Sequence, residues 1–265
     1  MSANVNVSVN PTLPAWPYPR WIAHRGAGKL APENTLAAFR VGVSHGYRAF
    51  ECDVKLSADG VPFLLHDSTL ERTTSGFGNA GDRSWCELSQ LDAGDWHSRA
   101  CTGEPLPRLE AVARYCIRNG FALNLEIKPM PGDELRTGRV VALEAARLWA
   151  GQDLPPLLSS FQPAALHAAR DAAPELPRAL LLDKLPDGWL AQAQALGCVA
   201  VVTNHAVMDA AVLSQLHAAG LRALAYTVND ATVAQRLLEL NGIGIDGIIT
   251  DAVDRFSPSG RTPPR

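Results

Sequence analysis

Two pairs of charged side chains, each with a spacing of two residues, stand in apolar runs of the sequence. Glu51 and Asp53 form one pair, and Glu126 and Lys128 form the other. In a strand, residues two apart project to the same face, so each pair presents its groups together. Three carboxylates in one site repel one another by roughly 4 kcal/mol per pair, at about 4 Å and an effective dielectric of about 20. A bound cation or protonation must relieve that repulsion, and oxygen ligands alone favour Mg²⁺ or Ca²⁺.

Two histidines and two cations accompany these acids. His24 and Arg25 end one apolar run, and His66 ends another run that returns from an Asp-Gly turn. Beside a divalent ion, Arg25 and Lys128 would make an electropositive pocket for a phosphate. Histidines that do not bind the metal suit general acid–base roles, each worth about 10²–10⁴ in rate. If the strands point these side chains inward, the set predicts cleavage of a phosphate ester.

Simpler structural roles compete with this interpretation. Any single acid can cap a helix or join an ion pair, and a lone histidine is more often structural than catalytic. The joint placement of the acids and histidines at the ends of strands favours a site. Glu33, just ahead of Asn34 and Thr35, is first of all predicted to start a helix, with a substrate role as the second possibility. Five further histidines lack such company and are predicted to be surface or packing residues: His45, His97, His167, His205 and His217.

Short apolar runs alternate with longer amphipathic stretches from about residue 21 onward. The predicted strands are Trp21–His24, Ala49–Val54, Ala122–Ile127, Leu157–Phe161, Ala179–Leu182, Val199–Thr203, Ala223–Val228 and Gly247–Thr250. Apolar residues recur every three or four positions in helix-like segments that include Asn34–Ser44, Leu109–Asn119, Glu134–Ala150, Pro163–Ala172, Val207–Ala219 and Ala231–Leu240. A doubly wound open sheet would alternate in the same way. The count of eight strands, and polar residues at nearly every strand's C-terminal end, favour a closed α/β fold, the TIM (β/α)₈ barrel.

Residues 57–108 interrupt this rhythm between the second strand and its helix. The stretch is rich in Gly, Ser, Asp and Trp, and its length predicts a functional loop or a small subdomain. It begins with an Asp-Gly turn and the apolar run Val61–Leu65, which indicates a hairpin. We therefore expect a barrel over 21–256, an insertion over 57–108 that caps one edge of its mouth, a Pro-rich N-terminal extension over 1–20 and a disordered tail over 257–265.

Composition narrows the range of partners. The 265-residue chain is 47% hydrophobic and has a net charge of −3, with its Lys and Arg residues scattered. That pattern argues against nucleic acid or an anionic membrane surface as the main partner. No apolar run reaches the roughly 18 residues of a membrane span, and no secretory signal is visible, so we expect a cytoplasmic protein without stable membrane insertion. The five cysteines lack CxxC spacing and are expected to be reduced; the oligomeric state stays open.

Around the acids, histidines and cations named above, the sequence resembles the glycerophosphodiester phosphodiesterase family. The matching segments occur in family order and span most of the chain. They are AHRGAGKLAPENTLAAF from Ala23, FECDVKLSADGVPFLLHDSTLERTTSG from Phe50, LNLEIKP from Leu123, SSFQP from Ser159, YTVN from Tyr226 and GIITDAVD from Gly247. The resemblance implies a TIM barrel with an insertion after the second strand.

The resemblance also implies roles for individual residues. It implies metal ligands at Glu51, Asp53 and Glu126, an acid–base pair at His24 and His66, and phosphate contacts at Arg25 and Lys128. Phe161 and Tyr226, in two of the matching segments, are expected to contact the substrate. Tyr226 stands where many relatives carry Trp, which leaves the preferred head group open.

The expected reaction is hydrolysis of a glycerophosphodiester to glycerol 3-phosphate and an alcohol, assisted by one Mg²⁺ or Ca²⁺ ion. The nucleophile is either water or the neighbouring glycerol hydroxyl, which would give a cyclic phosphate that water then opens. Two rival functions remain. An enolising lyase or aldolase would also combine acidic ligands with a His or Lys base, and a substrate panel distinguishes it. A barrel that binds glycerophosphodiesters without cleaving them would show no metal-dependent turnover.

Overall fold

The computed structural model describes residues 13, 15–256 and 258 of the chain. The expectation of a disordered tail over 257–265 therefore lies outside the described residues, apart from residue 258, and so does most of the extension over 1–20.

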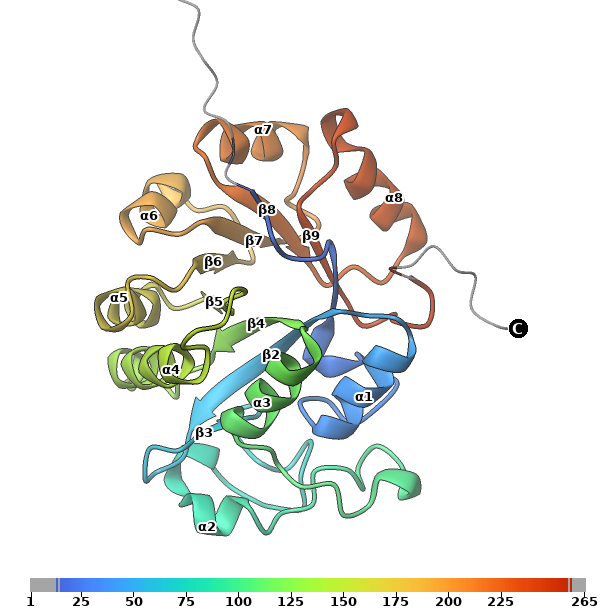
Figure 1. Ribbon diagram of the computed structural model, residues 1–265, viewed down its shortest axis with the longest axis vertical. Coiled ribbons are helices and arrows are strands. Elements are labelled where there is room, and N and C mark those ends of the chain that lie inside the picture. The colour runs from blue at the N-terminus through green and yellow to red at the C-terminus, as the bar shows by residue number, and fades with distance from the viewer. Residues whose placement is uncertain (1–12, 14, 257, 259–265) are drawn as a thin grey trace, which may run out of the picture.

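Eight parallel strands form a closed barrel (Figure 1). They are β1 (Trp21–Ala23), β2 (Ala49–Leu56), β4 (Ala122–Ile127), β5 (Leu157–Ser160), β6 (Arg178–Leu182), β7 (Ala200–Asn204), β8 (Arg222–Tyr226) and β9 (Gly247–Thr250). The first strand closes the sheet, because Ala23 pairs with Phe50 of β2 on one side and with Thr250 of β9 on the other. The predicted TIM barrel is confirmed, and the open doubly wound sheet is excluded.

Helices lie outside the barrel between consecutive strands (Figure 1). They are α1 (Leu36–Ser44), α3 (Leu109–Asn119), α4 (Glu134–Leu148), α5 (Pro163–Ala172), α6 (Trp189–Ala195), α7 (Ala210–Ala218) and α8 (Ala231–Glu239). Two of them begin later than the periodicity predicts. Thr35 and Asp209 have extended backbones and accept hydrogen bonds from the amides of Ala38 and Val212, so they cap α1 and α7 instead of belonging to them.

The stretch between β2 and α3 folds around an apolar cluster of its own. The strand β3 (Pro62–Leu64) pairs antiparallel with β2, as the Asp-Gly turn predicts. Three short helical turns follow: η2 (Ala80–Asp82), α2 (Trp85–Leu88) and η3 (Arg99–Cys101). The cluster consists of Phe63, Leu65, Leu70, Ala80, Leu88, Ala93 and Leu106. Because β3 turns back beside the C-terminal end of β2, this stretch brings its residues to the barrel mouth.

The opposite end of the barrel is closed by side chains. Residues near the start of the strands form one buried layer, which includes Ala49, Ala122 and Leu157. Trp16 and Tyr18, which precede β1, pack against this layer, and the Tyr18 hydroxyl donates to the carbonyl of Pro155 at 3.1 Å. Apolar packing thus fills the N-terminal end of the barrel, and the polar strand ends face the other opening.

Candidate active site

Three buried carboxylates meet at the C-terminal ends of β2 and β4. Asp53 and Glu126 are direct neighbours in the parallel register, and Glu51 lies two residues before Asp53 on the same face of β2. Glu51, Asp53 and Glu126 are only 3%, 1% and 8% exposed. One ligand oxygen from each lies within 4.8 Å of the others. The sheet register thus builds the acidic cluster that the spacing in sequence predicts.

The chemistry of this cluster fits a hard divalent cation. Burial, followed by the charge of Asp53, raises the pKa of Glu51 to about 8. Burial and the same neighbouring charge also raise the pKa of Glu126. The buried Glu51 Oε1 has no hydrogen-bond partner among the described residues. A carboxylate oxygen left in this way normally has a ligand, and an all-oxygen set suits Mg²⁺ or Ca²⁺ better than zinc.

Two cations lie against the cluster. Arg25 Nε is 3.3 Å from Asp53 Oδ2, and Lys128 Nζ is 3.3 Å from Asp53 Oδ1 and 2.7 Å from Glu126 Oε1. Burial alone would raise the pKa of Asp53, but the charges of Lys128 and Arg25 lower it well below its usual range. The cluster therefore holds at least one firmly ionised carboxylate with two positive groups beside it.

The turn after β1 orients Arg25 through an uncommon backbone conformation. Arg25 has φ of +50°, and its backbone N–H donates to Glu51 Oε2 at 3.0 Å. A β-carbon on the next residue, Gly26, would lie 2.8 Å from the β-carbon of Ala38 in α1. The turn can therefore pack on α1 only because residue 26 is glycine. This local geometry lets both the amide and the guanidinium of Arg25 reach the acids.

Asn34 is a site residue that sequence reasoning assigned only to a helix start. Its side-chain amide donates to Asp53 Oδ2 at 2.8 Å, and its oxygen accepts from the Asp53 backbone N–H at 3.1 Å. Asn34 is buried and has φ of +61°, a conformation that Asn tolerates better than most residues. The two bonds fix the direction of the Asp53 carboxylate. Its position directly before the cap residue concealed this role.

His24 is held by residues from the last two strand ends. Its Nδ1 lies 2.6 Å from Asp251 Oδ1, and its Nε2 lies 3.7 Å from Glu51 Oε2. Asn229 in turn donates to Asp251 Oδ2 at 2.9 Å. Burial alone would lower the pKa of His24, but the hydrogen bond to Asp251 and the charge of Glu51 raise it. Sequence reasoning missed Asp251, although it follows β9 within a segment that matches the family.

His66 is held by charged residues of the stretch that follows β3. Its Nδ1 lies 2.6 Å from Asp67 Oδ1, and Arg72 Nε lies 2.5 Å from Asp67 Oδ2. Arg72 also donates to both oxygens of Glu33, at 2.9 and 2.7 Å, and Glu33 accepts from Arg25 at 2.9 Å. Burial lowers the pKa of His66. Glu33 thus lies ahead of α1 and joins the two arginines, one of which also contacts Asp53.

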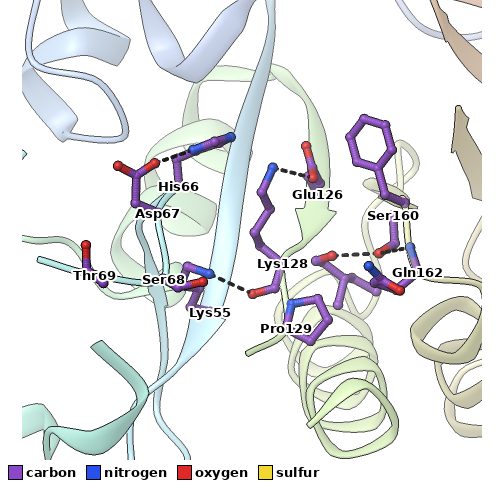
Figure 2. A pocket seen from close by; sticks show the side chains of 12 residues that line it. Lys55, His66, Asp67, Ser68, Thr69, Glu126, Lys128, Pro129, Ser160 and Gln162 are labelled. Atoms are coloured by element: carbon purple, nitrogen blue, oxygen red, sulfur yellow. Dashed lines mark hydrogen bonds and ion pairs between the residues drawn. The ribbon is translucent and has the colours of Figure 1, made fainter. Parts of the chain in front are cut away.

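A pocket of about 430 Å³ opens beside this centre (Figure 2). Its lining includes His66, Glu126, Lys128 and Phe161. The other charged residues predicted for the site do not line it. Asp53 contacts Lys128 of the lining, Arg25 contacts Asp53, and Glu51 contacts both Arg25 and His24. The Phe161 ring meets Tyr226 edge-on, with centroids 5.6 Å apart. The two aromatic residues predicted to contact substrate therefore touch each other, and Phe161 belongs to the pocket lining.

Two of the remaining five histidines contact residues away from the acidic cluster. His217 Nε2 lies 2.9 Å from Asp246 Oδ2, and His97 Nε2 lies 3.1 Å from the carbonyl of Lys29. None of the five lines the pocket beside the acidic cluster.

The glycerophosphoryl diester phosphodiesterase family model matches residues 24–255. The chain belongs to this family. The matched range contains every acid, histidine and cation described above. The expected type of enzyme, a phosphoric diester hydrolase of the glycerophosphodiester class, is confirmed by this match and by the relatives that follow.

Family members of similar length resemble this one closely. The glycerophosphodiester phosphodiesterase of Caldanaerobacter subterraneus subsp. tengcongensis is 31% identical over 87% of this chain and 93% of its own. YhdW of Bacillus subtilis (strain 168) is 33% identical over 91% of this chain and 97% of its own. A solved structure shows an Oleispira antarctica phosphodiesterase in complex with the product sn-glycerol-3-phosphate. Its sequence is 36% identical to this chain, and the two structures superpose with a TM-score of 0.81 over 89% of this chain and 94% of that one.

Among the described residues, no helix has the length and apolar character needed to span a bilayer. The cytoplasmic location stays a prediction.

Proposed function

We propose that this family member hydrolyses glycerophosphodiesters to glycerol 3-phosphate and a free alcohol. The observation that carries the proposal is the meeting of three buried carboxylates with Arg25 and Lys128, beside two histidines that are each held by a second acid. The sn-glycerol-3-phosphate bound to the Oleispira antarctica relative supports the same product here.

In this proposal Glu51, Asp53 and Glu126 hold one divalent cation, Mg²⁺ or Ca²⁺. The unpartnered Glu51 Oε1 and the raised pKa of Glu51 support that assignment. When bound, such a cation neutralises the carboxylates and withdraws charge from the phosphoryl oxygens.

Arg25 and Lys128 bind the nonbridging oxygens of the substrate phosphate. Both side chains lie at the acidic cluster. Arg25 pairs with Asp53, and Lys128 pairs with Asp53 and Glu126. Each retains further N–H donors for a phosphate, and such charge-assisted bonds are the stronger kind. Phe161 and Tyr226 contact the organic part of the diester at the mouth.

His24 and His66 exchange protons with the reacting oxygens. In each, Nδ1 faces an acid, Asp251 or Asp67, so Nε2 is the nitrogen left for the substrate. One histidine takes the proton of the nucleophile while the oxygen of the nucleophile forms a bond to phosphorus. The other donates a proton to the alcohol oxygen as the phosphorus–oxygen bond breaks. The nucleophile is water or the neighbouring glycerol hydroxyl, and in the second case water opens the cyclic phosphate in a further step.

A divalent-dependent assay tests the whole proposal. Glycerol 3-phosphate release from several glycerophosphodiesters is measured before and after EDTA, and again after Mg²⁺ or Ca²⁺ is restored. We expect release to disappear with EDTA and return with the metal. Release that is insensitive to EDTA would remove the metal from the proposal. Turnover of sugar phosphates or keto acids in place of diesters would favour a lyase or aldolase, and binding without any turnover would favour a non-catalytic barrel.

A further inference from the structure

Lys55 is a buried lysine in the wall of the pocket. It lies on β2 two residues beyond Asp53, on the same face of the strand. The residue is only 2% exposed, yet it belongs to the lining of the 430 Å³ pocket together with Lys128 and His66 (Figure 2). Besides Lys128, the pocket wall therefore carries a positive group that the proposed reaction does not use.

The ammonium of Lys55 has one hydrogen-bond acceptor among the described residues. Its Nζ donates to the backbone carbonyl of Lys128 at 3.2 Å, as Figure 2 shows. Among the described residues, no carboxylate forms an ion pair with Lys55. The nearby Asp53 and Glu126 pair with Lys128 instead. An ammonium carries three N–H groups, so two remain for other acceptors.

A buried ammonium with so few acceptors needs another partner. Burying a charge is costly unless it is paired and fully hydrogen-bonded, and one neutral carbonyl provides only part of that compensation. The pocket is the space from which a further acceptor can come. Because Lys55 lines that space, a ligand group with oxygen acceptors or a negative charge can reach its free N–H groups.

The rest of the wall suits the same chemistry. Ser68 and Gln162 line the pocket with a hydroxyl and an amide, and neither side chain has a hydrogen-bond partner among the described residues. The Phe161 ring already has Lys128 Nζ 5.7 Å from its centroid, and Tyr226 meets its edge at 88°. A quaternary ammonium is bound by an open cage of several aromatic rings, whereas Phe161 is the single aromatic residue among the described residues that line this pocket. Two lysine ammonium groups would also repel it.

We propose that Lys55 selects the alcohol part of the diester. The favoured head groups are rich in oxygen acceptors and neutral or anionic, such as a polyol or a serine carboxylate, and the disfavoured ones are cationic, such as choline and ethanolamine. The scissile phosphate stays with Arg25 and Lys128, while Lys55 contacts the head group. This inference rests on the proposed hydrolysis of glycerophosphodiesters and adds the substrate class to it.

The test compares kcat/KM across five diesters with the metal present: glycerophosphoglycerol, glycerophosphoinositol, glycerophosphoserine, glycerophosphocholine and glycerophosphoethanolamine. We expect the wild type to prefer the first three over the last two by about tenfold or more, the size of one charge-assisted hydrogen bond. Lys55→Met, which keeps the length of the side chain without its charge, is expected to lose that ratio. Lys55→Arg keeps the charge and is expected to retain most of it.

Arg114→Met is the matched control, because it removes one positive charge from the exposed outer side of α3. It is expected to leave the ratio unchanged. A wild type that prefers glycerophosphocholine, or a Lys55→Met variant with the wild-type ratio, overturns the inference. If Lys55→Met does not fold, the wild-type ranking and Lys55→Arg still decide the matter. An enzyme that cleaves none of the five diesters would refute the proposed function instead, so the two failures can be told apart.

Discussion

The two histidines of the site are supported by different parts of the molecule. His24 is held by Asp251 and Asn229, which follow β9 and β8 and so belong to the barrel. His66 is held by Asp67 and Arg72, which belong to the stretch between β3 and α3, and Arg72 is 44% exposed. We call these the barrel arm and the insertion arm.

The two arms differ in what holds the acid behind each histidine in place. The barrel arm follows strands that are hydrogen-bonded on both sides, so Asp251 cannot shift without disturbing the sheet. The insertion arm depends on ion pairs that solvent reaches, from Arg72 to Asp67 and across to Glu33. Exposed ion pairs contribute little and are screened by salt. One site thus combines a rigid support with one that solution conditions can loosen.

The largest expected effect comes from removing either histidine. His24→Ala and His66→Ala should each reduce kcat on a glycerophosphodiester by at least about 10²–10⁴, because each removes one proton transfer. Metal binding, measured by calorimetry, should survive, since the three carboxylates remain. Near-normal rates in both variants would refute the acid–base assignment. A loss in one variant alone would show that only one arm is catalytic.

Neutralising the acid behind each histidine sharpens the comparison. Asp251→Asn and Asp67→Asn should each lower kcat by about 10- to 100-fold, as changes to supporting groups do. We expect the larger loss for Asp251→Asn, because Asp251 follows a strand that is hydrogen-bonded on both sides, whereas Asp67 is held by the 44% exposed Arg72. The measurement is kcat at saturating substrate for both variants. A larger loss for Asp67→Asn would reverse the ranking of the two arms.

A smaller effect is expected from Arg72→Gln, which breaks the link between Asp67 and Glu33. We expect kcat to fall by roughly three- to tenfold, by comparison with other supporting groups, with the melting temperature almost unchanged because the pairs are exposed. Arg72→Lys should restore only part of the rate, since an ammonium cannot bind two carboxylates in bidentate fashion.

Arg83→Gln is the matched control for that change, because Arg83 is an exposed arginine of the same stretch that pairs with Glu87. It should keep the wild-type rate. If it lowered kcat as much as Arg72→Gln, the effect would reflect the charge of the stretch and not the support of His66.

The smallest expected effect is a difference in salt dependence. Raising the ionic strength from about 0.05 to 0.5 M shortens the screening length to a few ångströms and weakens exposed ion pairs first. The rate ratio of wild type to Arg72→Gln should therefore shrink with salt, while the ratio of wild type to Asp251→Asn stays constant. Equal salt dependence of the two ratios would mean that the arms do not differ in exposure to solvent.

Sequence patterns predicted the fold and the acidic cluster well, because strand spacing is short-range information. Glu51, Asp53 and Glu126 converge because residues two apart share a face and neighbouring parallel strands stay in register. The helix starts were less accurate, since Thr35 and Asp209 cap helices whose starts the periodic pattern placed two and three residues too early. Asn34 was assigned to a helix because its amide bonds run to a residue 19 positions away.

The sequence by itself determined the barrel, the hairpin after β2, the family and the types of side chain available for chemistry. Only the tertiary structure decided that Asp251 faces His24 across 227 positions of chain and that Glu33 joins Arg25 to Arg72. It also decided that Lys55 is buried beside the pocket, where no carboxylate of the described residues pairs with it. The physical reason is the separation in sequence of the residues that interact. Periodicity records which face a residue occupies on its own strand or helix, whereas hydrogen bonds and ion pairs across a barrel mouth depend on which strands close it.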